Sequence, residues 1–183
     1  MSRFPAPATI DEAPAASRPM LRAAEARFGR LPNMLRLLAV SPAALQGYMA
    51  LLAALDQGTL GAQTSERVSL AVAEANSCQY CLSLHVHHAR NRVGLDDAEI
   101  TANRNGASND LTADAAVRFA VKLAQTPKAV GDDDLAALHN AGFDDAEITE
   151  IVLQVGLNTL ASYVNKVGDP DLDFPLIKTR KAD

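Results

Sequence analysis

Apolar side chains recur every three or four positions through most of the chain, which is the pattern of amphipathic helices. Ser41 and Pro42, a natural N-cap and a first-turn proline, begin one such apolar stripe, which runs to Gly58. Similar signals predict further helices over residues 19–28, 33–40, 64–75, 78–94, 97–104, 112–126, 132–140 and 145–166. No segment shows the strict alternation of a half-buried strand. The pattern therefore predicts an all-α fold.

Both ends of the chain lack this periodicity. Residues 1–16 are rich in alanine and proline, so we expect an extended N-terminal arm that is either disordered or docked on a neighbouring subunit. Residues 169–183 are expected to form a C-terminal tail that packs against the body or a second subunit. The apolar residues for this packing are Leu172, Phe174, Leu176 and Ile177. A single helical domain is expected over residues 17–168.

Two of the predicted helices begin with nearly the same sequence. Residues 94–101 read GLDDAEIT, and residues 142–149 read GFDDAEIT. Acidic side chains suit a helix N-terminus, because they face the positive end of the helix dipole. A single echo of this length favours a weak structural repeat over a repeat array.

Composition and charge narrow the class of protein. The chain has 183 residues, of which 48% are apolar and 21% charged, as expected of one domain that folds unaided. A net charge of -5 argues against a nucleic-acid partner. The chain has no run of about 20 apolar residues, which is the length that a membrane span requires. Its N-terminus also lacks the apolar core of a signal peptide. We therefore expect a soluble, cytoplasmic protein without a membrane partner.

The two cysteines are the most informative feature of the chain. Two are too few for the disulfide framework of a secreted domain, and they form the motif Cys78-Gln-Tyr-Cys81. Asn76 and Ser77 are expected to break the preceding helix and to cap a new one, so that the motif opens a helix. Both the dipole of that helix end and a nearby imidazole favour the reactive thiolate.

Cys78, Cys81, His85 and His88 are spaced by three, four and three positions and share one helix face, whereas His87 points away. A zinc site is one interpretation, but Cys78 and His88 would lie roughly 15 Å apart on a straight helix, while zinc ligands lie within about 2.3 Å of the ion. A second interpretation is that the cysteines are unreactive core residues and that the histidines are structural residues with hydrogen-bond partners. We favour the third, a redox dithiol without a metal, in which one cysteine attacks an oxidant and the other resolves the product.

A carboxylate that orients the imidazole of His85 would complete such a site, and Glu66 is the candidate. If the chain reverses near Asn76, antiparallel packing brings Glu66 beside His85 and His88. A continuous helix would instead leave Glu66 about 18 Å from Cys78. An equally good alternative is that Glu66 only complements the dipole of its own helix.

The spacing of these residues resembles that of a known family. The motif consists of Glu66, then eleven residues, Cys78-x-x-Cys81, three residues and His85. It is similar to the core motif of the AhpD-like alkylhydroperoxidases, a family of the carboxymuconolactone decarboxylase superfamily. The stretch ERVSLAVAEANSCQYCLSLHVHHAR is similar throughout, most of all to the peroxidase-related branch. The resemblance extends over about residues 31–174.

The resemblance implies a multi-helix bundle that assembles into a homo-oligomer, a trimer or a hexamer. It implies reduction of organic hydroperoxides or hydrogen peroxide without haem, flavin or metal, and a dithiol reductant such as a dihydrolipoyl protein. By this analogy Cys81 is the peroxidatic cysteine, Cys78 resolves it, and Glu66 and His85 relay protons. The helix dipole alone would slightly favour Cys78 as the reactive thiol.

The chain departs from the family at one position. Tyr80 stands where the best-known members have a histidine, and a phenol with a pKa of about 10 is a poor base at neutral pH. Two other functions stay open. One is a dithiol oxidoreductase or redox sensor that acts on a protein partner, and the other is a helical assembly module with inert cysteines. A lactone decarboxylase of the superfamily would not need the two cysteines.

Overall fold

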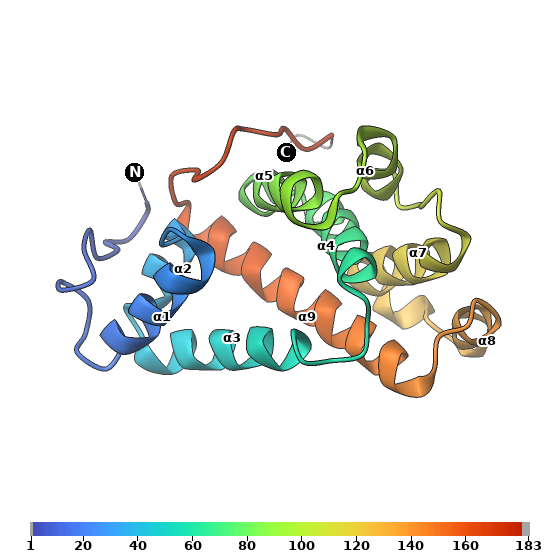
Figure 1. Cartoon of the computed structure of the whole chain (residues 1–183), viewed down its shortest axis with the longest axis horizontal. Helices are drawn as coiled ribbons and strands as arrows, with labels where there is room; N and C mark the ends of the chain where they lie inside the picture. Colours follow the sequence, from blue (N-terminus) through green and yellow to red (C-terminus); the bar gives the residue numbers. More distant parts are fainter. Residues whose placement is uncertain (1, 181–183) are drawn as a thin grey trace.

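The structure, a computed structural model, describes residues 2–180 and contains no strand within them, which confirms the predicted all-α fold (Figure 1). The α-helices are α1 (Arg18–Phe28), α2 (Asn33–Leu38), α3 (Pro42–Leu55), α4 (Ala62–Ala75), α5 (Gln79–His88), α6 (Asp97–Arg104), α7 (Leu111–Gln125), α8 (Asp132–Asn140) and α9 (Asp145–Gly168). A π-helical turn, η1 (Ala89–Val93), follows α5, and a short 3₁₀ turn, η2 (Pro127–Ala129), follows α7. None of these helices is long and apolar enough to cross a lipid bilayer.

Side chains cap the starts of α3, α6, α7 and α9 within one residue of the predicted positions. Ser41 accepts a hydrogen bond from the backbone N–H of Ala44 at 3.3 Å and so begins α3. α4 begins at Ala62, two residues before the start of the predicted range, so this prediction was wrong. Its N-cap is Gly61, whose carbonyl accepts a hydrogen bond from the backbone N–H of Ser65. The helix predicted over residues 78–94 is α-helical only as far as His88 and then widens into η1.

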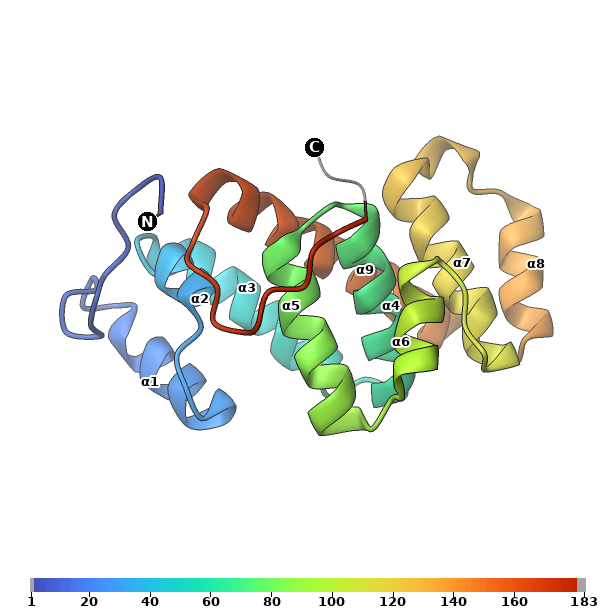
Figure 2. The ribbon, with the colours of Figure 1, turned by 90° about the horizontal axis from the view of Figure 1, so that it is seen from above.

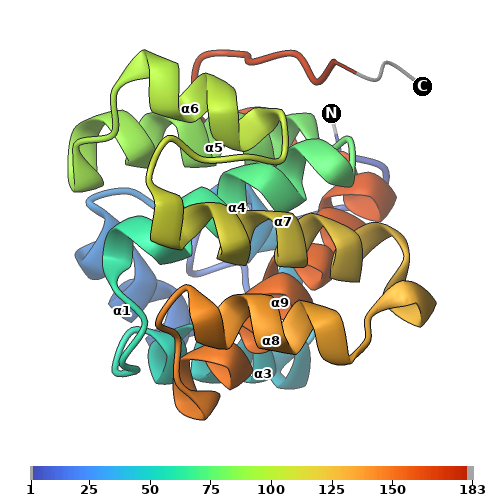
Figure 3. The same ribbon diagram turned by 90° about the vertical axis from the view of Figure 1, so that its right-hand side faces the viewer.

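The long helix α9 runs across the molecule from one end to the other. α1 and α2 lie at one end, and α7 and α8 lie at the other (Figures 1 and 2). α4 packs against α5, α6, α7 and α9, so it is covered on several sides. α7, α8 and the first half of α9 enclose a second apolar cluster with α4. Figure 3 shows these helices from the end of the molecule at which α7 and α8 lie. Large side chains of the two clusters include Leu35, Leu45, Leu70 and Leu82 in one and Val68, Phe119, Leu138 and Ile151 in the other.

The two ends of the chain both lie against the helical body. The backbone N–H of Arg3 donates to the carbonyl of Gly168 at 2.8 Å, which holds the N-terminal arm at the end of α9. The C-terminal tail crosses α5 (Figure 2), where the backbone N–H of Ile177 donates to Ser83 Oγ at 3.0 Å. The arm and the tail therefore pack on their own chain, and their domain boundaries stay predictions.

The echoed sequences form the same helix start but use their glutamates differently. Asp96 and Asp144 are both N-caps, each accepting from the backbone N–H three residues later. Glu147 bonds back to the N–H of Asp144 and closes a capping box. Glu99 instead accepts from Arg67 at 2.8 Å and ties α6 to α4.

The pair of Arg67 and Glu99 is the most deeply buried ion pair in the described part of the chain, with side chains 10% and 8% exposed. Burial raises the pKa of Glu99, but hydrogen bonds from Ser108, Asn103 and the backbone N–H of Asn109 outweigh it and hold that pKa below its ordinary value. The carboxylate is therefore ionised and fully engaged in the fold.

We expect Glu99→Ala to lower the free energy of unfolding by about 3 kcal/mol or more, because it leaves the Arg67 guanidinium buried without its carboxylate. Arg118→Gln is the matched control, since its pair with Asp114 has an arginine side chain that is 65% exposed, and it is expected to cost less than about 1 kcal/mol. Urea unfolding measures both. Equal losses in the two variants would contradict a structural role for the buried pair.

Candidate functional site

A sharp chain reversal places the cysteine motif. Ser77 has φ 52°, in the left-handed region that residues other than glycine seldom adopt, and it folds α5 back along α4. The backbone N–H of Cys78 donates to the carbonyl of Ala73 at 3.0 Å across this turn. Cys78 is itself the N-cap of α5, because its Sγ accepts from the N–H of Cys81 at 3.2 Å. The predicted break is confirmed, whereas the cap is one residue later than expected.

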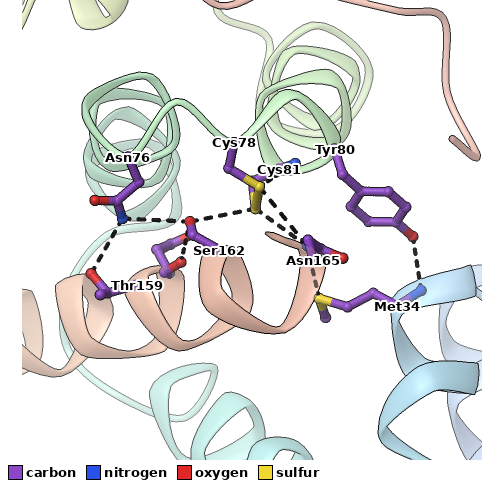
Figure 4. The surroundings of a disulfide bond; sticks show 9 residues. Met34, Asn76, Cys78, Tyr80, Cys81, Thr159, Ser162 and Asn165 are labelled. Atoms are coloured by element: carbon purple, nitrogen blue, oxygen red, sulfur yellow. Dashed lines mark hydrogen bonds between the residues drawn. A yellow bond between two sulfur atoms is a disulfide. The ribbon is translucent and has the colours of Figure 1, made fainter. Parts of the chain in front are cut away.

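A disulfide bond joins Cys78 and Cys81, whose Cα atoms lie 5.3 Å apart. Each cysteine is only 3% exposed. The side-chain amide of Asn165 on α9 donates to Cys81 Sγ at 3.4 Å and lies 4.0 Å from Cys78 Sγ (Figure 4). Ser162, one turn earlier on α9, has its Oγ 3.6 Å from Cys81 Sγ. The disulfide therefore rests on a polar stripe of α9.

Glu66 and His85 lie together, as the predicted hairpin requires. His85 Nδ1 and Glu66 Oε1 are hydrogen-bonded at 2.8 Å, and both side chains are largely buried, at 14% and 13% exposure. The carboxylate fixes one ring nitrogen, so the other is left to serve as the proton donor or acceptor. Within residues 2–180 no direct hydrogen bond joins His85 to either sulfur. His85 and Cys81 instead line the same cavity.

That cavity has a volume of about 590 Å³ and lies between α3, α4, α5 and α9. Its walls combine the polar groups above with apolar side chains from α3 and α9, including Leu52, Leu55 and Leu157. The lining also includes arginines that lie over aromatic rings. For example, the guanidinium carbon of Arg30 lies 4.2 Å from the ring centre of Phe174. A cavity of this size accepts a small organic molecule.

His88 completes a group that could hold a metal ion. Glu66, His85 and His88 each offer a ligand atom, and these atoms lie within 4.8 Å of one another. Nitrogen and carboxylate ligands suit zinc, and two of the three groups, Glu66 and His85, are already hydrogen-bonded to each other. Burial, reinforced by charges on His85, Arg92 and His87, lowers the pKa of His88 to about 3, so its ring is neutral at physiological pH.

The remaining sequence candidates form no hydrogen bond with the described pair of Glu66 and His85 or with the disulfide, although Tyr80 and His87 also line the cavity. His87 is exposed and contacts the ring of Phe174, and His139 on α8 is bonded to the carbonyl of Phe143. The Tyr80 hydroxyl bonds to neither sulfur. It accepts from the backbone N–H of Met34 at 3.2 Å and donates to the carboxylate of Asp173 in the tail.

Tyr80 is therefore a structural link and not a base. Burial, together with its hydrogen bond to Asp173, raises the pKa of this phenol well above its ordinary value and keeps it protonated. This contact explains in physical terms how the chain accommodates tyrosine at the position where a family histidine is expected.

The α9 residues at the disulfide were missed by the sequence analysis. Asn158, Ser162 and Asn165 are all buried, at spacings of four and three residues, on the face of a helix whose other buried residues are mostly apolar. A polar stripe on a core-facing helix side is a signal in the sequence, because buried polar groups need hydrogen-bond partners. The sequence does not reveal that two of those partners are sulfurs.

Residues 42–126 match the sequence profile of the carboxymuconolactone decarboxylase family. This segment includes α4, the chain reversal and α5, and so contains Glu66, both cysteines and His85. No curated protein matches the chain.

Solved structures share the whole fold. A peroxidase-related protein from Ralstonia eutropha JMP134, described as an alkylhydroperoxidase AhpD core, is 23% identical, with 94% of this chain and 92% of that chain covered and a TM-score of 0.79. A peroxidase-related protein from Silicibacter sp. TM1040 is 21% identical, with 94% and 93% covered and a TM-score of 0.81. A cysteine variant of the debrominase Bmp8, in complex with 2,3,4-tribromopyrrole, is 19% identical, with 94% of both chains covered and a TM-score of 0.78.

At these identities the structural likeness shows the fold, and the profile match places the cysteine motif within the family. The chain thus contains a segment of the carboxymuconolactone decarboxylase family, residues 42–126, within the fold of AhpD-like peroxidase-related proteins.

Proposed function

We propose that the protein is a cysteine peroxidase that reduces organic hydroperoxides or hydrogen peroxide through a dithiol–disulfide cycle of Cys78 and Cys81. The observation that carries this proposal is that Cys81 lines the same cavity as the hydrogen-bonded pair of Glu66 and His85. A nucleophile and an oriented proton carrier thus face one space in which a small substrate can bind.

The reaction has two balanced steps. In the reduced protein the Cys81 thiolate attacks the terminal oxygen of the hydroperoxide, the O–O bond breaks, and His85 supplies the proton with which the alcohol leaves. The Cys78 thiol then attacks the resulting sulfenic acid, which forms the disulfide and releases water. Glu66 holds His85 in place through the hydrogen bond to its Nδ1.

The cavity supports Cys81, and not Cys78, as the attacking cysteine. Cys81 lines the cavity with His85, whereas Cys78 does not. The amide of Asn165 donates to Cys81 Sγ and would stabilise a thiolate there. Asn165 Oδ1 is buried without a hydrogen-bond partner in the described part of the chain, so it can accept the O–H of a bound hydroperoxide. These contacts agree with the role that the family resemblance implies.

Burial of the sulfurs argues against the alternative of a dithiol oxidoreductase that acts on a protein disulfide. Each cysteine is 3% exposed, so a disulfide on the surface of a folded partner cannot reach them. The hydrogen-bonded pair of Glu66 and His85 in the cavity would likewise have no role in an inert assembly module. The debrominase Bmp8 shares the fold, so a brominated pyrrole is the second substrate class to assay. The trimeric or hexameric assembly and the cytoplasmic location are further proposals.

Cys81→Ser is expected to abolish consumption of tert-butyl hydroperoxide in the presence of dihydrolipoamide, because it removes the nucleophile. Cys78→Ser is expected to allow one oxidation of Cys81 and to prevent formation of the intramolecular disulfide. Peroxide consumption and mass spectrometry of the oxidised thiols measure these outcomes. Full turnover in Cys81→Ser would refute the mechanism, and a disulfide that forms without any turnover would favour an exchanger or sensor.

Asn165→Leu is expected to raise the pKa of the Cys81 thiol. A hydrogen bond to a charged group contributes about 1.5–3 kcal/mol, so alkylation of Cys81 by iodoacetamide at pH 7 should slow about tenfold in the Cys78→Ser background. Asn158→Leu is the matched control, because Asn158 is equally buried on α9 but its amide bonds Ser69 and Gln154. An equal loss of reactivity in both variants would assign Asn165 to packing alone.

A further inference from the structure

The two sulfurs of the disulfide face different cavities. Cys81 lines the first cavity with Glu66 and His85, and Cys78 lines a second cavity of about 570 Å³. Neither sulfur-bearing residue lines both. Asn165 and Tyr80 line both cavities and thus form part of the wall between them. One disulfide is therefore approached from two separate spaces.

The second cavity is built where the two ends of the chain meet α5 and α9. Its lining includes Arg3 from the arm, Lys166 at the end of α9, and Asp169 and Leu172 from the tail. Arg3 is held in place by its backbone bond to Gly168 and by a bridge to Asp169 of 3.8 Å. None of the groups of the proton relay reaches this cavity. Its chemistry is limited to Cys78 and the polar groups around it.

We propose that the second cavity is the binding site of a small dithiol reductant, which attacks Cys78 while the hydroperoxide uses the first cavity. This inference rests on the proposed function for its place in a catalytic cycle. It assigns one substrate to each cavity: the oxidant to Cys81 and the reductant to Cys78.

The proposed step balances with a dithiol as the reductant. One thiolate of the dithiol attacks Cys78 Sγ, the bond between Cys78 and Cys81 breaks, and Cys81 leaves as a thiolate beside the Asn165 amide. The second thiol of the reductant then attacks the reductant sulfur of the mixed disulfide. This closes a cyclic disulfide and releases Cys78, which takes up the proton. Two electrons pass from the dithiol to the protein.

The burial of Cys78 fixes the shape of this reductant. With Cys78 3% exposed, only a slender dithiol, free or at the end of a flexible arm, can reach its sulfur through the cavity. A second thiol on the same molecule is also needed, because a mixed disulfide formed inside the cavity is shielded from a second reductant molecule. Dihydrolipoamide has both properties and is the probe for the test.

The test measures the two half-reactions separately by stopped flow. Gln79→Trp narrows the second cavity at an exposed residue that does not line the first. It is expected to slow reduction of the disulfide by dihydrolipoamide at least tenfold and to leave oxidation of the dithiol by tert-butyl hydroperoxide within twofold. Leu55→Trp is the matched variant, because Leu55 lines only the first cavity, and it is expected to slow oxidation and spare reduction. Leu172→Trp narrows the second cavity again if Gln79→Trp does not fold.

Reduction that is unchanged in a folded second-cavity variant, or slowed as much by Leu55→Trp, would overturn the proposal. The result is separable from the proposed function. The disulfide can be formed with diamide, so its reduction by dihydrolipoamide is measured even if no hydroperoxide reacts. If Gln79→Trp selectively slows reduction, in a protein that no hydroperoxide oxidises, the result would support a reductant site in the second cavity and would refute the peroxidase function.

Discussion

The reversal of the chain between α4 and α5 is the constraint on which the site depends. It takes three residues, and Ser77 makes it possible by adopting a left-handed conformation. Because α5 then runs back along α4, His85 comes within 2.8 Å of a carboxylate that lies 19 residues earlier in the chain. α4 is in turn held by packing against α6, α7 and α9 and by the buried ion pair of Arg67 and Glu99. The position of Glu66 is therefore a property of the whole bundle.

The second requirement is a polar surface under the disulfide. The α4–α5 hairpin by itself provides the sulfurs with only the N–H groups at the start of α5, of which that of Cys81 reaches Cys78. The end of α9 adds Asn165, whose amide faces both sulfurs. A buried amide with one unpartnered oxygen lowers stability, because its desolvation is uncompensated. Such an arrangement is understandable where the amide acts on the reacting sulfur and its substrate.

The sequence predicted what depends on short stretches of chain. Helical spacing, the break before Cys78 and antiparallel geometry were enough to place Glu66 beside His85. The contacts from α9 and the tail were not predicted, because Asn165 meets Cys81 across 84 positions, and Asp173 meets Tyr80 across 93. Such contacts depend on how distant helices pack, which periodicity does not encode. The argument against zinc considered the helix of the cysteine motif alone, so it did not include the group of Glu66, His85 and His88, whose carboxylate comes from the preceding helix α4.

The tyrosine in the cysteine motif makes sense when the two cavities are considered together. If the oxidant and the reductant approach one disulfide from separate cavities, the wall between the two cavities must stay closed and must not transfer protons from one cavity to the other. A histidine in that wall would titrate near neutral pH, whereas Tyr80 stays protonated and is tied to Met34 and to Asp173 in the tail. The same bond anchors the tail that lines the second cavity. The residue that departs from the family pattern thus links the cysteine helix to the segment that shapes the entrance to Cys78.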